Sequence, residues 1–119
     1  MWNNGDMATE VLITDEFERW WDTLKVEEQK SVAVVVDMLE DRGALLPFPY
    51  SSGIAGSKKL RELRIQHAGE PYRVLYAFDP KRNALLLLGG NKTGENRWYE
   101  VNVPRAEKFF AQYLRESGQ

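Results

Sequence analysis

The sequence predicts an α+β domain with the element order β-α-α-β-β-β-α, in which a helical hairpin packs on a small, mostly antiparallel sheet. Three observations predict this fold. Apolar residues recur at helical spacing up to residue 42, three strand-like runs separated by turns follow between residues 60 and 88, and another helical stripe lies near the C-terminus. The chain has 119 residues, which fits a single domain over residues 1–119.

The first helix of the predicted hairpin follows a short strand. Residues 9–14 are rich in β-branched side chains, and Thr14 or Asp15 can cap a helix that begins there. The apolar stripe of this helix has the spacing i, i+3, i+4, i+7 and consists of Phe17, Trp20, Trp21 and Leu24. Residues 1–8 are expected to form a flexible N-terminal extension, with Met7 as an alternative start.

The second helix is predicted over residues 26–42 and ends at Gly43. Its apolar stripe consists of Val32, Val35, Val36 and Leu39. Several prolines, glycines and serines follow, and they predict a loop over residues 43–59.

Three strands and a last helix complete the prediction. The strands cover residues 60–65, 72–78 and 84–88, with turns between them. The third strand is five apolar residues in a row, which indicates a central strand that is covered on both faces. The last helix is predicted from residue 104, where a proline fits the first turn, to residue 114.

The composition excludes several kinds of site. With no cysteine and one histidine, the chain has no disulfide framework, no thiolate nucleophile and no cysteine-ligated or poly-histidine metal site. We therefore expect no metal and no cofactor. No apolar run approaches the roughly 20 residues of a membrane span, and no signal-peptide pattern is visible. A cytoplasmic protein without membrane contact is the expectation.

Charge is divided along the chain. Residues 1–42 carry a formal charge of −7, whereas residues 57–105 carry +5. A local basic surface can concentrate a polyanion even when the net charge of the chain is −2. The alternative is a solvated surface on which charges of one sign cluster without a function.

Strand alternation places four charged residues together. Glu62, Arg64 and Arg73 fall on the face opposite the apolar side chains of their strands, and Lys92 follows the end of the third strand. On an open, concave sheet face this set would suit a phosphate, because the arginine donor fork matches phosphate oxygens. The alternative is a set of ordinary solvent-facing cations.

Other motifs point less clearly to a function. The segment 89–94 contains a Lys-Thr pair but lacks the spacing of a nucleotide-binding P-loop. His67 lies beside a predicted turn and is interpreted as a surface residue rather than a catalytic base. Trp98 or Tyr99, which follow a polar loop, could stack on a nucleobase if exposed.

The strand motifs resemble a known family. Residues 60–65, residues 72–76 and the apolar strand that leads into residues 90–93 resemble the RelE/ParE superfamily of bacterial toxins, and are most similar to its phage-derived HigB-like branch. The resemblance covers roughly residues 9–115 and implies a RelE-like fold. It also implies the toxin of a type II toxin–antitoxin system. RelE- and HigB-like members are endoribonucleases that cut mRNA on the ribosome, whereas ParE-like members inhibit DNA gyrase.

The resemblance also implies roles for individual residues. Arg73 matches the arginine that contacts the scissile phosphate, and Arg64 and Lys92 match basic positions beside it. Tyr99 matches a tyrosine that orients the substrate base, and Glu62 stands where HigB-like members have glutamate, which makes it the candidate base. Three further basic residues complete the candidate substrate-binding set: Lys59, Arg61 and Arg97.

The implied reaction is attack of a nucleotide 2′-hydroxyl on its own 3′-phosphate, which needs no metal. The implied partners are mRNA on the ribosome and a helix-turn-helix antitoxin that forms a hetero-oligomer with the toxin. Two alternatives remain open: a gyrase inhibitor, and a non-catalytic module that binds nucleic acid or a partner protein on the same fold.

Overall fold

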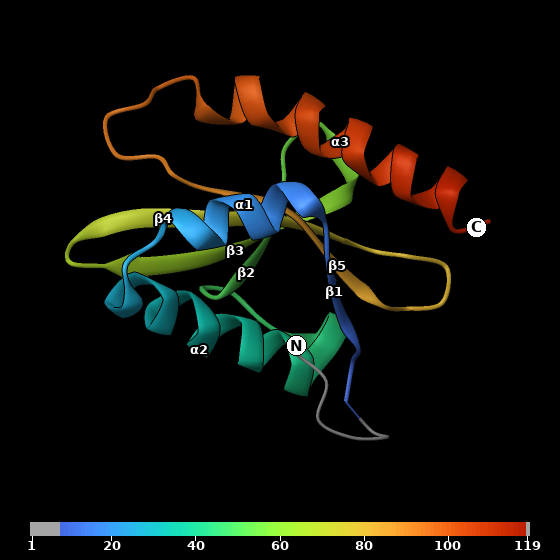
Figure 1. Cartoon of the computed structure of the whole chain (residues 1–119), viewed down its shortest axis with the longest axis horizontal. Helices are drawn as coiled ribbons and strands as arrows, with labels where there is room; N and C mark the ends of the chain where they lie inside the picture. Colours follow the sequence, from blue (N-terminus) through green and yellow to red (C-terminus); the bar gives the residue numbers. More distant parts are fainter. Residues whose placement is uncertain (1–7, 119) are drawn as a thin grey trace.

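The computed structural model describes residues 8–118, so the expected flexible extension lies, except for Ala8, outside the described residues. Figure 1 shows the arrangement of the elements. Their bounds are β1 Val11–Ile13, α1 Asp15–Thr23, α2 Val26–Arg42, the 3-10 turn η1 Gly43–Leu45, β2 Ser51–Ile54, β3 Ser57–His67, β4 Glu70–Phe78, β5 Ala84–Asn91 and α3 Trp98–Glu116. The predicted α+β class is confirmed.

The strands form one sheet in the order β1-β5-β4-β3-β2. β1 runs parallel to β5, and the other pairs are antiparallel, as predicted. Helices cover both faces: α1 and α2 lie on one side and α3 crosses the other (Figure 1). The five apolar residues of β5 are buried between these two layers, which confirms the predicted central strand.

Each layer has its own hydrophobic core. The core under α1 and α2 includes Phe17, Val36, Leu39, Leu63, Val74 and Leu86. The core under α3 includes Leu60, Leu75, Leu85, Leu87, Trp98 and Phe110. Alternate residues of β3 and β4 therefore serve different cores, because successive strand side chains point to opposite faces.

The helical hairpin begins and ends where the sequence predicts. The Thr14 hydroxyl accepts a hydrogen bond from the Phe17 backbone N–H at 3.0 Å and donates one to the Leu87 carbonyl at 2.7 Å. The Thr14 hydroxyl thus caps α1 and links this helix to β5. α2 ends at Gly43, whose φ of +56° favours glycine.

Two local predictions are wrong. The predicted loop over residues 43–59 contains the short strand β2, which pairs with β3, and β3 itself begins at Ser57. The last helix begins at Trp98, so Pro104 lies inside α3 and not in its first turn. An interior proline costs a helix about 3 kcal/mol. Burial of Trp98 and of the apolar face that follows it offsets this cost.

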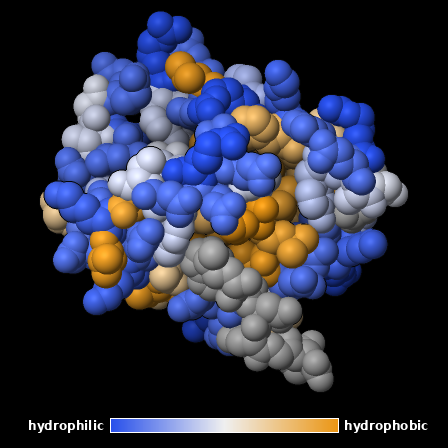
Figure 2. All heavy atoms as spheres, viewed as in Figure 1, coloured by the Kyte–Doolittle hydropathy of each residue, from blue (hydrophilic) through white to orange (hydrophobic). Residues whose placement is uncertain are grey.

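The face of the molecule that Figure 2 shows is mainly hydrophilic. In the orientation of Figure 1, hydrophobic residues gather near β1 and are elsewhere scattered among polar ones (Figure 2). None of the helices within residues 8–118 is long and apolar enough to cross a membrane.

Candidate active site

Three of the predicted site residues project from one face of the sheet. Glu62 and Arg64 alternate along β3, and Arg73 of β4 is the direct cross-strand partner of Arg64. Because residues two apart on a strand share a face, all three side chains point toward the layer that contains α3. The register therefore brings together a carboxylate and two guanidinium groups, as the strand alternation predicts.

This face is covered at the site, and the expectation of an open face is wrong. The side chains of Glu62 and Arg73 are each only 6% exposed, because the start of α3 lies over them. Gly90 makes this approach possible, since a Cβ atom there would lie 2.7 Å from Trp98 Nε1. The missing side chain lets Trp98 pack on the sheet and sets its neighbour Tyr99 above Glu62.

The hydroxyl of Tyr99 joins the charged groups. It donates a hydrogen bond to Glu62 Oε1 at 2.5 Å and accepts one from Arg73 Nε at 3.2 Å. Arg73 Nε also lies 3.5 Å from Glu62 Oε1. Arg64 Nη1 donates to the other oxygen of Glu62, Oε2, at 3.1 Å. Both carboxylate oxygens are thus engaged by donors from three different elements.

Lys92 completes the arrangement from the loop after β5. Its ammonium group lies 5.8 Å from the centroid of the Tyr99 ring, within the range of a cation–π contact. A cavity of about 430 Å³ opens between Lys92 and Tyr99. We call Glu62, Arg64, Arg73, Lys92 and Tyr99 the basic cluster. Three cations and one carboxylate give it a formal charge of +2.

Burial raises the pKa of the Tyr99 hydroxyl, and its hydrogen bond to the Glu62 carboxylate raises it further, whereas Arg73 acts in the opposite direction. The hydroxyl therefore stays protonated at neutral pH. Tyr99 acts here as a hydrogen-bond donor that holds the carboxylate in place.

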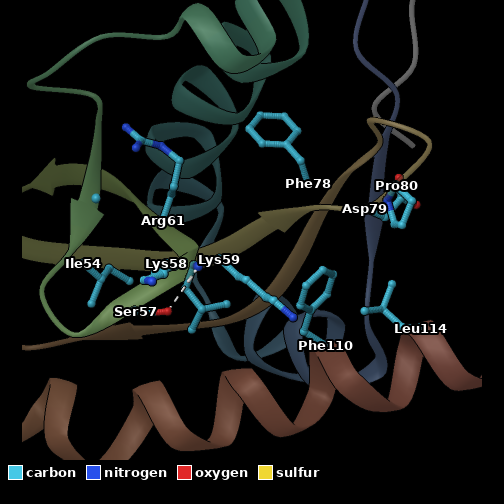
Figure 3. Close-up of a pocket in the computed structure, with 12 residues that line it drawn as sticks. Ile54, Ser57, Lys58, Lys59, Arg61, Phe78, Asp79, Pro80, Phe110 and Leu114 are labelled. Atoms are coloured by element: carbon cyan, nitrogen blue, oxygen red, sulfur yellow. Dashed lines mark hydrogen bonds between the residues drawn. The ribbon is translucent and has the colours of Figure 1, made fainter. Parts of the chain in front are cut away.

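Three predicted substrate-binding residues have contacts or cavities other than those of the basic cluster. Arg61 faces the opposite side of the sheet from Glu62, and its Nε donates to Ser51 Oγ at 3.2 Å. Lys59 and Arg61 line a separate cavity of about 660 Å³ at the other end of β3 (Figure 3). Figure 3 shows Arg61 pointing away from α3. Arg97 is exposed and pairs with Glu100 at 2.8 Å.

The family model described as phage-derived protein Gp49-like matches residues 19–111. The chain belongs to the Gp49-like family. Among its relatives, "Putative toxin HigB3" of Mycobacterium tuberculosis is 37% identical over 99 residues, which cover 82% of this chain and 87% of that protein. "Putative toxin HigB2" of the same organism is 33% identical over 106 residues. That match covers 86% of this chain but only 53% of the relative.

A solved structure of a mutant of the E. coli toxin RelE in the free state shares the fold of this Gp49-like chain. The TM-score is 0.57 at 15% sequence identity, over 83% of this chain and 98% of RelE. The resemblance to RelE- and HigB-like toxins that the strand motifs indicate is therefore confirmed, and the chain is the toxin of a toxin–antitoxin system.

The sequence did not point to one neighbour of the basic cluster in this Gp49-like toxin. The ring of Phe48, in the loop before β2, lies under the Arg64 guanidinium, with Cζ 5.3 Å from the ring centroid. The backbone N–H of Arg64 donates to the Tyr50 carbonyl at 2.9 Å, which fixes this loop against β3. The sequence signal at this place is a run of aromatic residues and prolines over residues 47–50, which predicts a loop.

Proposed function

We propose that this toxin is a metal-independent endoribonuclease that cuts mRNA on the ribosome and so stops translation. One observation carries the proposal: a buried carboxylate, two guanidinium groups and a tyrosine hydroxyl meet in one hydrogen-bonded set, and with Lys92 beside the tyrosine ring the basic cluster has a formal charge of +2. Such a set supplies both a proton acceptor and cations for a phosphodiester, without a cofactor. The proposed target places the protein in the cytoplasm.

In the proposed reaction, Glu62 accepts the proton of a nucleotide 2′-hydroxyl. The resulting 2′-oxygen attacks the adjacent phosphorus, and the bond from phosphorus to the 5′-oxygen breaks. The products are a 2′,3′-cyclic phosphate and a 5′-hydroxyl, which takes its proton from water. Arg73, Arg64 and Lys92 stabilise the additional negative charge on the phosphoryl oxygens. Tyr99 positions Glu62 and Arg73 through its two hydrogen bonds.

For a substrate phosphate to reach the basic cluster, one of the two arginines must break its contact with Glu62. The side chain of Arg64 is 32% exposed, whereas that of Arg73 is 6% exposed. A phosphate that approaches from solvent can therefore recruit Arg64 while Arg73 stays in place. Release of Arg64 also frees Oε2 of Glu62 to accept a proton.

The test compares growth arrest and transcript cleavage after induction in a bacterium. We expect discrete cuts in translated mRNA with the wild type, when 5′-ends are mapped against the reading frame. Arg73→Lys and Lys92→Ala should lower the cleavage rate by roughly 10²- to 10³-fold. Arg115→Ala removes an exposed cation at the far end of α3 and serves as the matched control. Thermal melts of the purified variants separate loss of chemistry from loss of folding.

The same experiment separates the alternatives. Loss of DNA supercoiling with intact mRNA would assign the toxin to the gyrase inhibitors and contradict the proposal. RNA binding without cuts on translating ribosomes would assign it to non-catalytic modules.

The proposed partner is a helix-turn-helix antitoxin that forms a hetero-oligomer with the toxin and covers or distorts the basic cluster. Co-expression with that antitoxin should restore growth and yield a complex in size-exclusion chromatography. The absence of any complex would count against a toxin–antitoxin pairing of this kind.

A further inference from the structure

Lys92 is the member of the basic cluster that lies outside the helices and strands. It follows the end of β5, whereas the other four members belong to β3, β4 and α3. Within residues 8–118 its ammonium group forms no ion pair, and its contact in the cluster is the ring of Tyr99. Because a lysine side chain is long and flexible, the place of this group depends on how firmly the loop holds the backbone of Lys92.

Hydrogen bonds fix that backbone on both sides of Lys92. The N–H of Lys92 donates to the carbonyl of Pro71 at 3.0 Å, and its carbonyl accepts from the N–H of Glu95 at 3.1 Å. The side chain of Asn91 supplies two further bonds, because its Oδ1 atom accepts from Thr93 N–H at 2.9 Å and from Thr93 Oγ1 at 2.6 Å. An asparagine that accepts from the backbone two residues on stabilises a turn, and Lys92 is the residue inside this turn.

The other end of the Asn91 amide holds the turn against the neighbouring hairpin. Its Nδ2 atom donates to Glu70 Oε1 at 3.0 Å. Glu70 is the first residue of β4 and pairs with His67 of β3, so it belongs to a part of the sheet that is fixed by its own strand pairing. One amide therefore connects the loop that carries Lys92 to the strands that carry Arg64 and Arg73.

Asn91 lies on the reverse side of the sheet from the basic cluster. It is the direct cross-strand partner of Tyr72, whose side chain belongs to the core under α1 and α2. Residues directly opposite each other on antiparallel strands share a face, whereas the basic cluster projects toward α3. A phosphate held by the cluster is therefore out of reach of the Asn91 amide.

We propose that Asn91 is a positioning residue, which holds Lys92 where its ammonium group can stabilise the phosphoryl oxygens. The inference rests on the proposed ribonuclease function and adds to it a residue that acts without touching RNA. Its physical reason is that a cation stabilises developing charge only at the right place, and a small misplacement lowers the rate steeply.

The test measures single-turnover cleavage of mRNA in purified ribosomal complexes with an empty A site, at saturating toxin. Asn91→Ala should lower the rate by about 10-fold, less than Lys92→Ala does, because the lysine is still present but is held less firmly. Gln112→Ala is the matched control, since it removes an exposed amide–carboxylate bond of the same kind, 2.9 Å long, from Gln112 to Glu116 on α3. The control should cut like the wild type. Asn91 is exposed, so its variants should melt near the wild-type temperature.

A double-mutant cycle separates positioning from a general structural role. If Asn91 acts through Lys92, adding Asn91→Ala to Lys92→Ala should cause no further loss of rate. A further loss of about 10-fold in the double variant would mean that Asn91 supports the site by another route, and it would overturn the inference.

An exchange of donor and acceptor tests the bond to the hairpin. Asn91→Asp keeps an acceptor for Thr93 but sets a second carboxylate against Glu70, so the rate should fall. Adding Glu70→Gln restores the bond in the opposite direction, with the formal charge of the wild type, and should recover most of the rate. A combined variant as slow as Asn91→Asp alone would contradict the role of this bond.

Failure of the inference can be told apart from failure of the proposed function. If Asn91→Ala cuts like the wild type while Lys92→Ala does not, the positioning role is wrong and the ribonuclease function stands. If the wild type cuts no RNA on ribosomes, the proposed function itself fails, and the positioning role fails with it.

Discussion

Glu62 and Arg73 form an ion pair between neighbouring strands beneath the first turn of α3. Arg73 Nε lies 3.5 Å from Glu62 Oε1, and both side chains are almost fully buried. Arg64, which contacts the other oxygen of Glu62, is partly exposed. The carboxylate thus has a fixed inner cation and an outer cation that is easier to exchange, because breaking a buried pair costs more than breaking an exposed one.

The first prediction concerns the stability of this buried pair. Glu62→Ala should lower the free energy of unfolding by about 3–5 kcal/mol, because Arg73 stays buried without its carboxylate. Glu62→Gln keeps the shape and one acceptor oxygen, and should cost less. Urea denaturation measures both. Arg97→Ala breaks the exposed pair with Glu100 and should change stability by less than about 1 kcal/mol. A Glu62→Ala variant as stable as the Arg97 control would contradict the burial of the pair.

The second prediction isolates the Tyr99 hydroxyl. Tyr99→Phe keeps the ring beside Lys92 but removes the hydrogen bonds to Glu62 and Arg73. We expect a stability loss of about 1–3 kcal/mol, because a buried acceptor loses its donor. Cleavage should fall by roughly 10-fold or more through misplacement of Glu62. Circular dichroism melts and transcript mapping measure the two effects, and unchanged cleavage would exclude a positioning role.

The third prediction separates two adjacent glycines of β5 that face opposite layers. A Cβ atom at Gly89 would lie 2.3 Å from Trp20 Cε3 of α1, whereas one at Gly90 would lie 2.7 Å from Trp98 Nε1 of α3. Both Gly89→Ala and Gly90→Ala should lower the melting temperature, since each forces a tryptophan to move. Only Gly90→Ala should also displace Tyr99 and reduce cleavage beyond the loss of folded protein. Equal specific activities, measured per folded molecule well below both melting temperatures, would contradict this division.

The fourth prediction concerns pH and Glu40 of α2. Glu40 is 3% exposed, and among the described residues its Oε2 atom has no hydrogen-bond partner. Burial raises the pKa of the Glu40 carboxyl, and the nearby Asp37 raises it further. A raised pKa means that the folded state holds the proton more tightly than the unfolded state. Glu40 therefore supports stability below its ordinary pKa of about 4 and loses this contribution as the pH rises.

Glu40→Gln should accordingly stabilise the protein at about pH 7 and have little effect at about pH 3, which lies well below the ordinary pKa of a glutamate, so that the carboxyl is neutral in both states. Denaturation curves of the two proteins at several pH values measure the difference. Asp37→Asn tests the second cause and should give a smaller change with the same sign. A stability difference that does not vary with pH would show that ionisation of Glu40 is not its source.

Much of the fold was predictable because its signals are local. The stripe of α2, the cap at Thr14 and the stop at Gly43 follow from periodicity and backbone preference within a few residues. The position at which α3 begins did not follow from such local rules. Pro104 resembled a helix start, but the packing of Trp98 on Gly90 extends the helix by six residues toward the N-terminus.

Strand β2 was missed for a similar reason. Its sequence, Ser-Ser-Gly-Ile, has little strand propensity, and it forms because β3 offers it a free edge. Pairing with a neighbour, which no local pattern reveals, outweighs propensity here. The same pairing brings Phe48 to Arg64.

Part of the candidate site was likewise predictable from a local pattern, and part of it was not. Strand alternation alone was enough to set Glu62, Arg64 and Arg73 on one face, because side chains of a strand alternate with a period of two. Whether that face was open depended on how the chain returns after β5, and only the tertiary structure shows Tyr99 above Glu62. The two residues are 37 positions apart, and their contact depends on a loop path and on the space left by a glycine. Neither the path of the loop nor the space left by the glycine produces a periodic pattern in the sequence.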